Sequence, residues 1–175
     1  MLKLLLLLPA VSAWSQGPGS ARESAVKAAF LYKFAGFVEW PAGTFRRADE
    51  PLVVGVLGNE AIAADLEQIA AGRNVDGRAV VVRRLRPGEA AGPLHVLLIG
   101  AGPDQQVREQ AAAMAGPVLV VTEQPQGLVP GGVLNLVTER GRVRFAASLP
   151  AAETRGLRLS ARLLAVAQNV EGRSR

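Results

Sequence analysis

The chain offers few side chains that could carry out catalysis or hold a metal. It contains one histidine, His95, and no cysteine, so a zinc site would depend almost entirely on carboxylates. No second histidine stands at the spacing of a metalloprotease motif, and Ser148 and Ser160 lack the G-x-S-x-G sequence of serine hydrolases. We therefore expect no enzyme activity, no metal and no cofactor. For His95 we expect a hydrogen-bonded position in the core.

A glycine-containing turn is the one segment with an enzyme-like pattern. Residues 100–104 read G-A-G-P-D between a predicted strand and a predicted helix, where a dinucleotide-binding loop would lie. Gln105 replaces the third glycine of that fingerprint, which favours a tight strand-to-helix turn. A different possibility stays open. Gly58 and Gly100 both follow predicted strands, so the strand ends could form a pocket for an anionic metabolite, and the chain would then be a small ligand-binding protein.

Two groups of residues could instead contact another protein. Arg142 and Arg144 alternate with apolar residues, which places both guanidinium groups on one face of a predicted strand, where they could bind carboxylates. A solvent-facing strand would show the same pattern. Glu39 and Trp40 stand at the end of an aromatic-rich segment, and large aromatic residues are common anchors of protein interfaces. We predict partner-binding roles for these four residues.

An amphipathic helix is predicted from Glu23 to about Trp40, where Pro41 removes a backbone donor and ends it. Its apolar residues recur at three- and four-residue steps, which places them on one side of a helix. These residues are Val26, Phe30, Phe34, Phe37 and Val38.

Short apolar runs then alternate with helical patterns. Strands are predicted at residues 52–57, 79–85, 95–99 and 117–122, and helices at 60–71 and 103–115. An antiparallel hairpin follows at 133–138 and 142–147. A helix is predicted within residues 151–170; Gly156 weakens its first half, so we expect it to start near Leu157. This order predicts a single-domain α/β layered sandwich. Its sheet is mostly parallel with a C-terminal antiparallel hairpin, and helices cover both faces.

The first residues resemble an export signal. One lysine precedes an apolar run of leucines, and small residues surround Ala13, so we predict a signal peptide at 1–13 and a periplasmic mature chain. We expect a disordered leader over 14–22 and one domain over 23–171. The formal net charge of +5 comes from basic residues that are spread along the chain, so we expect no nucleic-acid binding.

Seven segments together resemble the YfiR-like family of exported regulators. The longest are V-K-A-A-F-L-Y-K-F-A-G-F-V-E-W-P and G-L-R-L-S-A-R-L-L-A-V-A, and the resemblance extends from Ala25 to Val170. The seven segments are residues 26–41, 56–58, 95–99, 117–122, 131–136, 143–145 and 156–167. Three positions depart from the family pattern: Lys33 and Ser148 replace asparagine, and Leu94 replaces a cysteine.

The resemblance implies a regulatory function. The best-known relative represses an inner-membrane diguanylate cyclase by binding its periplasmic sensor domain, and an outer-membrane lipoprotein relieves that repression. By resemblance, we expect this chain to be a homodimer, to bind the periplasmic domain of a membrane signalling protein, and to bind an outer-membrane lipoprotein. Because the chain has no cysteine, redox control described for relatives does not apply to it.

Overall fold

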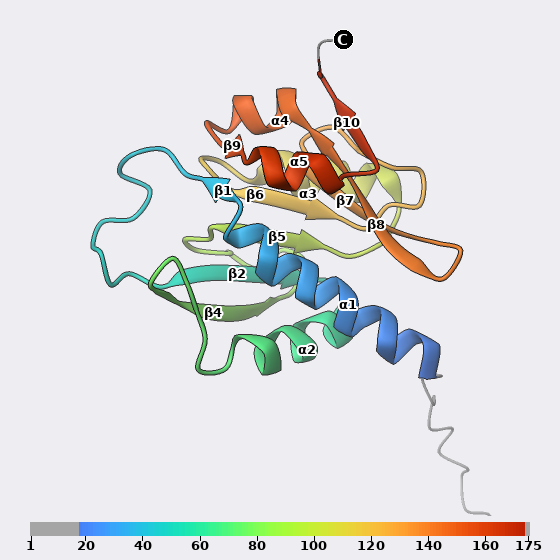
Figure 1. Ribbon diagram of the computed structural model, residues 1–175, viewed down its shortest axis with the longest axis horizontal. Helices are drawn as coiled ribbons and strands as arrows, with labels where there is room; N and C mark the ends of the chain where they lie inside the picture. Colours follow the sequence, from blue (N-terminus) through green and yellow to red (C-terminus); the bar gives the residue numbers. More distant parts are fainter. Residues whose placement is uncertain (1–17, 174–175) are drawn as a thin grey trace, which may run out of the picture.

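The computed structural model describes residues 18–173, so the predicted signal peptide and residues 14–17 lie outside the described part. Within this part, a curled, mostly parallel sheet forms the centre of the molecule (Figure 1). Its strands in spatial order are β10 (Asn169–Glu171), β8 (Arg142–Ser148), β7 (Leu134–Glu139), β6 (Leu119–Thr122), β5 (Val96–Ile99), β2 (Leu52–Leu57), β4 (Arg78–Leu85) and β3 (Asn74–Val75). Only the β7–β8 and β3–β4 pairs are antiparallel.

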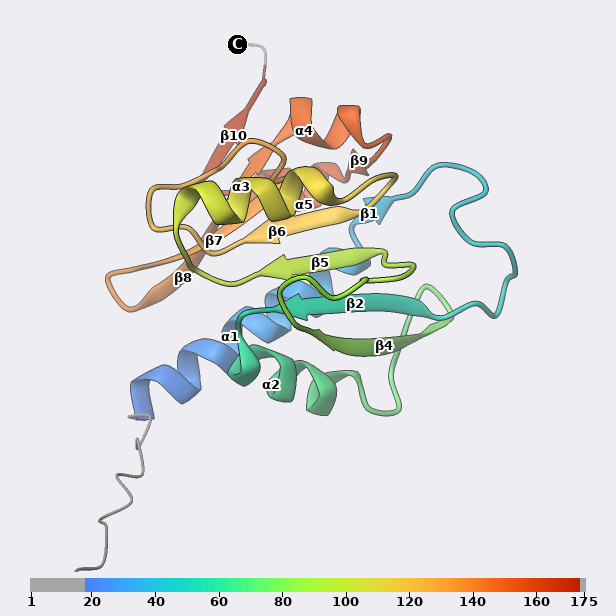
Figure 2. The same ribbon diagram turned by 180° about the vertical axis from the view of Figure 1, so that it is seen from behind.

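Helices cover both faces of this sheet, as predicted. Helices α1 (Pro18–Ala35), α2 (Glu60–Ala70) and α5 (Ala161–Val166) lie on one face, and α3 (Asp104–Ala113) lies on the other (Figures 1 and 2). A separate pair of short strands, β1 (Val38–Glu39) and β9 (Arg158–Leu159), is antiparallel. The α/β class, the parallel strands and the C-terminal β7–β8 hairpin are therefore confirmed.

The first helix differs from the prediction in both its bounds and its buried face. It begins at Pro18, so residues 18–22 are helical and the predicted leader is wrong there. It ends at Ala35 and not near Trp40, because the backbone that follows pairs with β9: Ser160 N donates to Phe37 O at 3.0 Å. The buried face is rotated from the predicted one, and Val26 is exposed. The buried apolar residues of α1 are Ala28, Leu31, Phe34 and Ala35.

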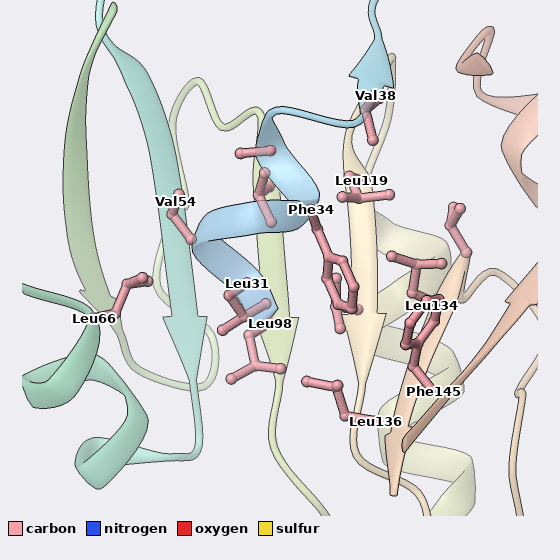
Figure 3. Packing of buried hydrophobic residues seen from close by; sticks show 14 of the residues in the cluster. Leu31, Phe34, Val38, Val54, Leu66, Leu98, Leu119, Leu134, Leu136 and Phe145 are labelled. Carbon is pink, nitrogen blue, oxygen red and sulfur yellow. The ribbon is translucent and has the colours of Figure 1, made fainter. Parts of the chain in front are cut away.

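Aromatic rings attach α1 to the sheet. The ring centroids of Phe34 and Phe145, from α1 and β8, lie 5.0 Å apart in an edge-to-face arrangement. Figure 3 shows both rings between the helix and the sheet, beside Leu134 and Leu136. A smaller apolar cluster lies on the opposite face, where Val107 and Ala111 of α3 pack against residues of β5 and β6. The sheet is thus buried on both faces in its middle.

The helix predicted over residues 151–170 is wrong. The structure has α4 (Leu149–Thr154), β9, α5 and β10 in this segment. Gly156 adopts φ +69°, a left-handed conformation that ends α4. Ser160 then starts α5 by accepting a hydrogen bond from Leu163 N at 3.2 Å. The apolar spacing is present, but Gly156 and the Ser160 cap divide the segment into separate elements.

No helix among residues 18–173 combines the length and the apolar character that a membrane crossing needs.

Candidate partner-binding site

The structure separates the two predicted groups of partner-binding residues. β1, which carries Glu39, lies at one end of the molecule, and the β7–β8 hairpin with Arg142 lies at the other (Figures 1 and 2). The four residues therefore form two surfaces. We call them the β1 surface (Glu39 and Trp40) and the β8 surface (Arg142 and Arg144).

Glu39 on the β1 surface is exposed and faces a cation across the small sheet. Glu39 and Arg158 are register partners in the β1–β9 pair, and Arg158 Nε lies 3.7 Å from a carboxylate oxygen of Glu39. Both side chains are largely solvated, so the pair contributes little to stability. The two charges are therefore available for contacts with another molecule.

Trp40 is half-buried and begins a stack of rings beneath the loop after β1. Its ring packs edge-to-face on Phe45, with centroids 5.9 Å apart. Phe45 in turn stacks on His95 at 4.3 Å, with an angle of 11° between the rings. The guanidinium of Arg78 lies 3.9 Å from the centroid of Phe45, a cation–π contact. Arg78 also donates to three backbone oxygens of the loop, those of Arg47, Ala48 and Glu50.

His95 is buried and hydrogen-bonded, as predicted. Its Nδ1 accepts from Val53 N at 3.0 Å, and its own backbone N donates to Val53 O at 2.9 Å. Burial lowers the pKa of His95; the nearby Glu50 carboxylate opposes this shift, and Arg78 adds to it. The neutral imidazole therefore ties the start of β2 to β5.

A hollow of about 770 Å³ lies beside this stack. Its wall carries Arg46 and Glu50, together with His95. The other lining residues are mostly apolar and include Pro41, Pro93, Leu94, Met114, Pro117 and Val118. A hollow that combines apolar and charged lining residues suits contact with a protein side chain.

The β8 surface has the geometry that the alternation of residues predicts. Arg142 and Arg144 are both exposed, whereas Phe145 is buried on the other face of the strand. Glu139 lies directly opposite Arg142 in the hairpin, and Gln168 Nε2 donates to Glu139 Oε2 at 2.7 Å. The two arginines form no ion pair with another described residue. Their side chains are therefore able to bind carboxylates of a partner.

Gly58 and Gly100 are brought together at the ends of β2 and β5. A Cβ on Gly100 would lie 2.6 Å from the carbonyl oxygen of Gly58, and Gly100 N donates to Leu57 O at 2.8 Å. Close packing of two backbones therefore accounts for glycine at position 100. The prediction of an anionic ligand at these glycines stays a prediction.

A buried polar network fills the same edge of the sheet, and sequence reasoning did not find it. Glu123, which follows β6, accepts from Lys27 Nζ at 2.8 Å and from Asn59 Nδ2 at 2.9 Å. Lys27 also contacts Glu23 at 2.7 Å, and Glu23 accepts from Thr138 Oγ1. Burial of Lys27 disfavours its charge, but the hydrogen bonds to both carboxylates outweigh this and raise its pKa. The network ties α1 to α2, β6 and β7.

The polar groups of the described residues do not form a metal site: no cluster of three or more His, Asp or Glu side chains suited to a metal ion occurs within residues 18–173. The described residues thus form a mixed α/β domain with a mostly parallel sheet.

A family model described as YfiR/HmsC-like matches residues 24–168. The chain belongs to this family, whose members are periplasmic regulators of cyclic di-GMP signalling. A comparison with curated proteins finds no match.

Proposed function

We propose that the mature chain binds the periplasmic sensor domain of an inner-membrane diguanylate cyclase, or of a similar signalling protein, and represses it. Membership of the YfiR/HmsC-like family carries this proposal. The structure supports it with two separate exposed surfaces that bear unpaired or weakly paired charges. The chain acts by occupying a surface of the cyclase and makes or breaks no bonds.

The β8 surface is the part that we assign to the sensor domain. Arg142 and Arg144 project from a strand whose opposite face is fixed in the core by Phe145. The strand fixes the backbone positions and the spacing of the two arginines, so only their side chains need to be ordered when they bind carboxylates. We expect their charges to speed association and to make binding sensitive to salt.

The β1 surface then remains for a second contact. Because it lies at the other end of the molecule, it can be occupied while the β8 surface is bound. We assign Glu39 and Trp40 to a homodimer contact or to an outer-membrane lipoprotein that sequesters the chain. Sequestration then relieves repression without overlap of the two surfaces, because a chain held by a lipoprotein at the outer membrane is removed from the pool that reaches the sensor domain at the inner membrane.

Repression requires only a difference in affinity between two states of the sensor domain. A preference of about 3 kcal/mol for the inactive state changes the population ratio by about two orders of magnitude. A few well-placed anchors supply this much, because a handful of residues dominates most interfaces.

Deletion of the gene tests the proposal in cells. We expect cellular cyclic di-GMP to rise, and to return to its original level when the intact gene is restored. A gene for Arg142→Glu with Arg144→Glu should fail to restore it, because the β8 surface becomes acidic. The matched control is Arg22→Glu with Arg108→Glu, which reverses two exposed charges on α1 and α3. An unchanged cyclic di-GMP level after deletion, with the protein normally exported, contradicts the proposal.

A further inference from the structure

β4 lies at the border of the sheet and has a partner on its outer side for only two residues. β3 pairs with Arg78 and Ala79, whereas residues 80–85 pair with β2 alone among the described strands. The border position is visible from both sides of the molecule (Figures 1 and 2). The backbone groups on the outer side of residues 80–85 are therefore available to a further strand.

The hairpin between β3 and β4 shows which backbone groups point outward. Val75 and Arg78 face each other across the two-residue turn formed by Asp76 and Gly77, both with positive φ. Such a turn closes on a hydrogen-bonded pair, so the backbone groups of Arg78 point away from β2. Alternation along the strand directs those of Val80, Val82 and Arg84 the same way.

Charged side chains normally protect an exposed strand edge, but the two arginines of β4 near this edge are held by other contacts and do not cover its backbone groups. The Arg84 guanidinium forms ion pairs with Glu60 and Glu67 of α2. Arg83 Nη1 donates to Ala91 O at 2.6 Å. The side chain of Val81, which lies between Val80 and Val82 in the strand, is 42% exposed. The middle of this edge is thus an uncharged, β-branched run that favours strand pairing.

A hollow of about 320 Å³ runs beside the edge, between β4 and the end of α2. Its lining combines small and apolar residues with three polar ones. These residues are Ala70, Ala71, Gly72, Ala79, Val80 and Val82, together with Glu67, Arg73 and Asn74. In an added strand, every second side chain would point to this face of the sheet. The hollow therefore provides space for those side chains, as in proteins that bind an extended segment at a sheet edge.

Charge selects the kind of occupant. Arg73, which lines the hollow, and Arg86, which follows β4, form no ion pair with another described residue, and the charge of Arg83 is not neutralised by its hydrogen bond to Ala91 O. The nearby carboxylates of Glu60 and Glu67 are already paired with Arg84. Pairing with a second copy of this chain would bring these cations close to their own counterparts, which is unfavourable. An acidic segment would be attracted by them.

We propose that the outer edge of β4, residues 80–84, binds an extended acidic segment of a partner protein, which joins the sheet as an additional strand. The inference rests on the proposed function only for the identity of that partner. The edge itself is tested without any cyclase, so a failure of this inference and a failure of the proposed function are distinguishable.

The direct test is amide hydrogen exchange, followed by NMR, on the mature chain alone and with a synthetic peptide. The probe is an acetylated and amidated six-residue peptide of alternating glutamate and valine. In the free protein, we expect faster exchange at Val80, Val82 and Arg84 than at Val81 and Arg83. The peptide should slow exchange at the first three by at least about tenfold at saturation. A peptide with lysine in place of glutamate should bind at least about tenfold more weakly.

Two sets of variants strengthen the test. Val82→Pro removes an outward N–H and should weaken peptide binding by at least about tenfold. Arg73→Glu with Arg86→Glu changes exposed side chains and should reverse the preference between the acidic and basic peptides, even if Val82→Pro does not fold. The matched control, Arg22→Glu with Arg108→Glu, should leave the preference unchanged.

Three results would overturn the inference. One is equal affinity for the acidic and basic peptides. Another is a set of peptide-induced changes that maps away from residues 70–86. The third is protection of Val80, Val82 and Arg84 that increases with protein concentration, which would assign the edge to a second copy of the chain.

Discussion

Lys27 Nζ lies 2.8 Å from Glu123 Oε1, although the two residues are 96 positions apart in the sequence. The side chains of Lys27 and Glu123 are only 12% and 3% exposed. The pair crosses from the first helix to the end of β6, and Asn59 adds a hydrogen bond from the start of α2. This contact fixes the helix over the edge of the sheet where the parallel strands end.

Lys27→Met should therefore destabilise the fold strongly. The change leaves the Glu123 carboxylate buried without its cation, which typically costs about 3 to 5 kcal/mol. Urea unfolding measures this loss. Lys33→Met, an exposed lysine on the same helix, is the control and should change stability by less than about 0.5 kcal/mol. Equal effects of the two substitutions would show that the ion pair is not needed.

His95 should make stability depend on pH. Because burial depresses the pKa of His95 in the folded state, the unfolded chain binds the proton more readily. Stability is complete above the ordinary pKa of 6.5, decreases as pH falls below it, and levels off below the folded-state pKa. The expected slope is at most about 1.4 kcal/mol per pH unit. Unfolding midpoints measured between about pH 7.5 and pH 5 check this.

The control for the pH effect is His95→Asn, whose amide oxygen can still accept from Val53 N. This variant should lose most of the slope in that range. Glu23 acts in a separate range: its pKa is lowered by the hydrogen bonds from Lys27 and Thr138. Its contribution is present above the ordinary value of 4.5 and is lost as pH falls below it. A slope above pH 5 that persists in His95→Asn would contradict the assignment to His95.

Trp40 should tolerate phenylalanine better than alanine. Its indole Nε1 is a buried polar atom without a hydrogen-bond partner in the described part of the chain. Trp40→Phe keeps the packing on Phe45 and removes this donor, so stability should stay within about 1 kcal/mol or increase. Trp40→Ala removes the ring and should cost about 3 kcal/mol. Thermal and urea unfolding of both variants test this, and a Phe variant as unstable as the Ala variant would contradict it.

Arg155 should be required for the order of the segments around the end of α3. Its guanidinium donates to Ala111 O and Met114 O at 2.8 and 2.9 Å, and to Gly131 O at 3.1 Å. Arg155→Met should cost about 2 to 3 kcal/mol and speed amide exchange near Gly116 and Gly131. Arg155→Lys should recover little, because an ammonium group cannot reproduce the fork of donors. Arg158→Met, at an exposed position, is the control, and an equal loss there would refute the role of Arg155.

Local sequence patterns predicted much of the fold because each pattern reports one short element. Apolar runs located β2, β5 and β6 to within two residues, since a strand buried on both faces needs continuous apolar side chains. The pattern was misleading for α1 and for residues 151–170. There, pairing with β9 and the left-handed Gly156 decide where helices end, and the Ser160 cap decides where the next one begins.

The candidate site could be predicted only in part, for a related reason. Alternation along β8 placed Arg142 and Arg144 correctly on an exposed face. No local pattern links Phe45 to His95, or Lys27 to Glu123, because these contacts join segments that meet only in the folded chain. The free edge of β4 likewise depends on strand order, which the sequence does not reveal.

Addition of the purified mature protein to spheroplasts of a strain that lacks its gene tests the central claim most directly. The protein then reaches only the outer side of the inner membrane, where the sensor domain of a cyclase lies. We predict that intracellular cyclic di-GMP falls in a saturable way toward the original level, and that Arg142→Glu with Arg144→Glu needs at least about tenfold more protein. A cyclic di-GMP level that stays unchanged at high concentrations of folded protein would contradict the account.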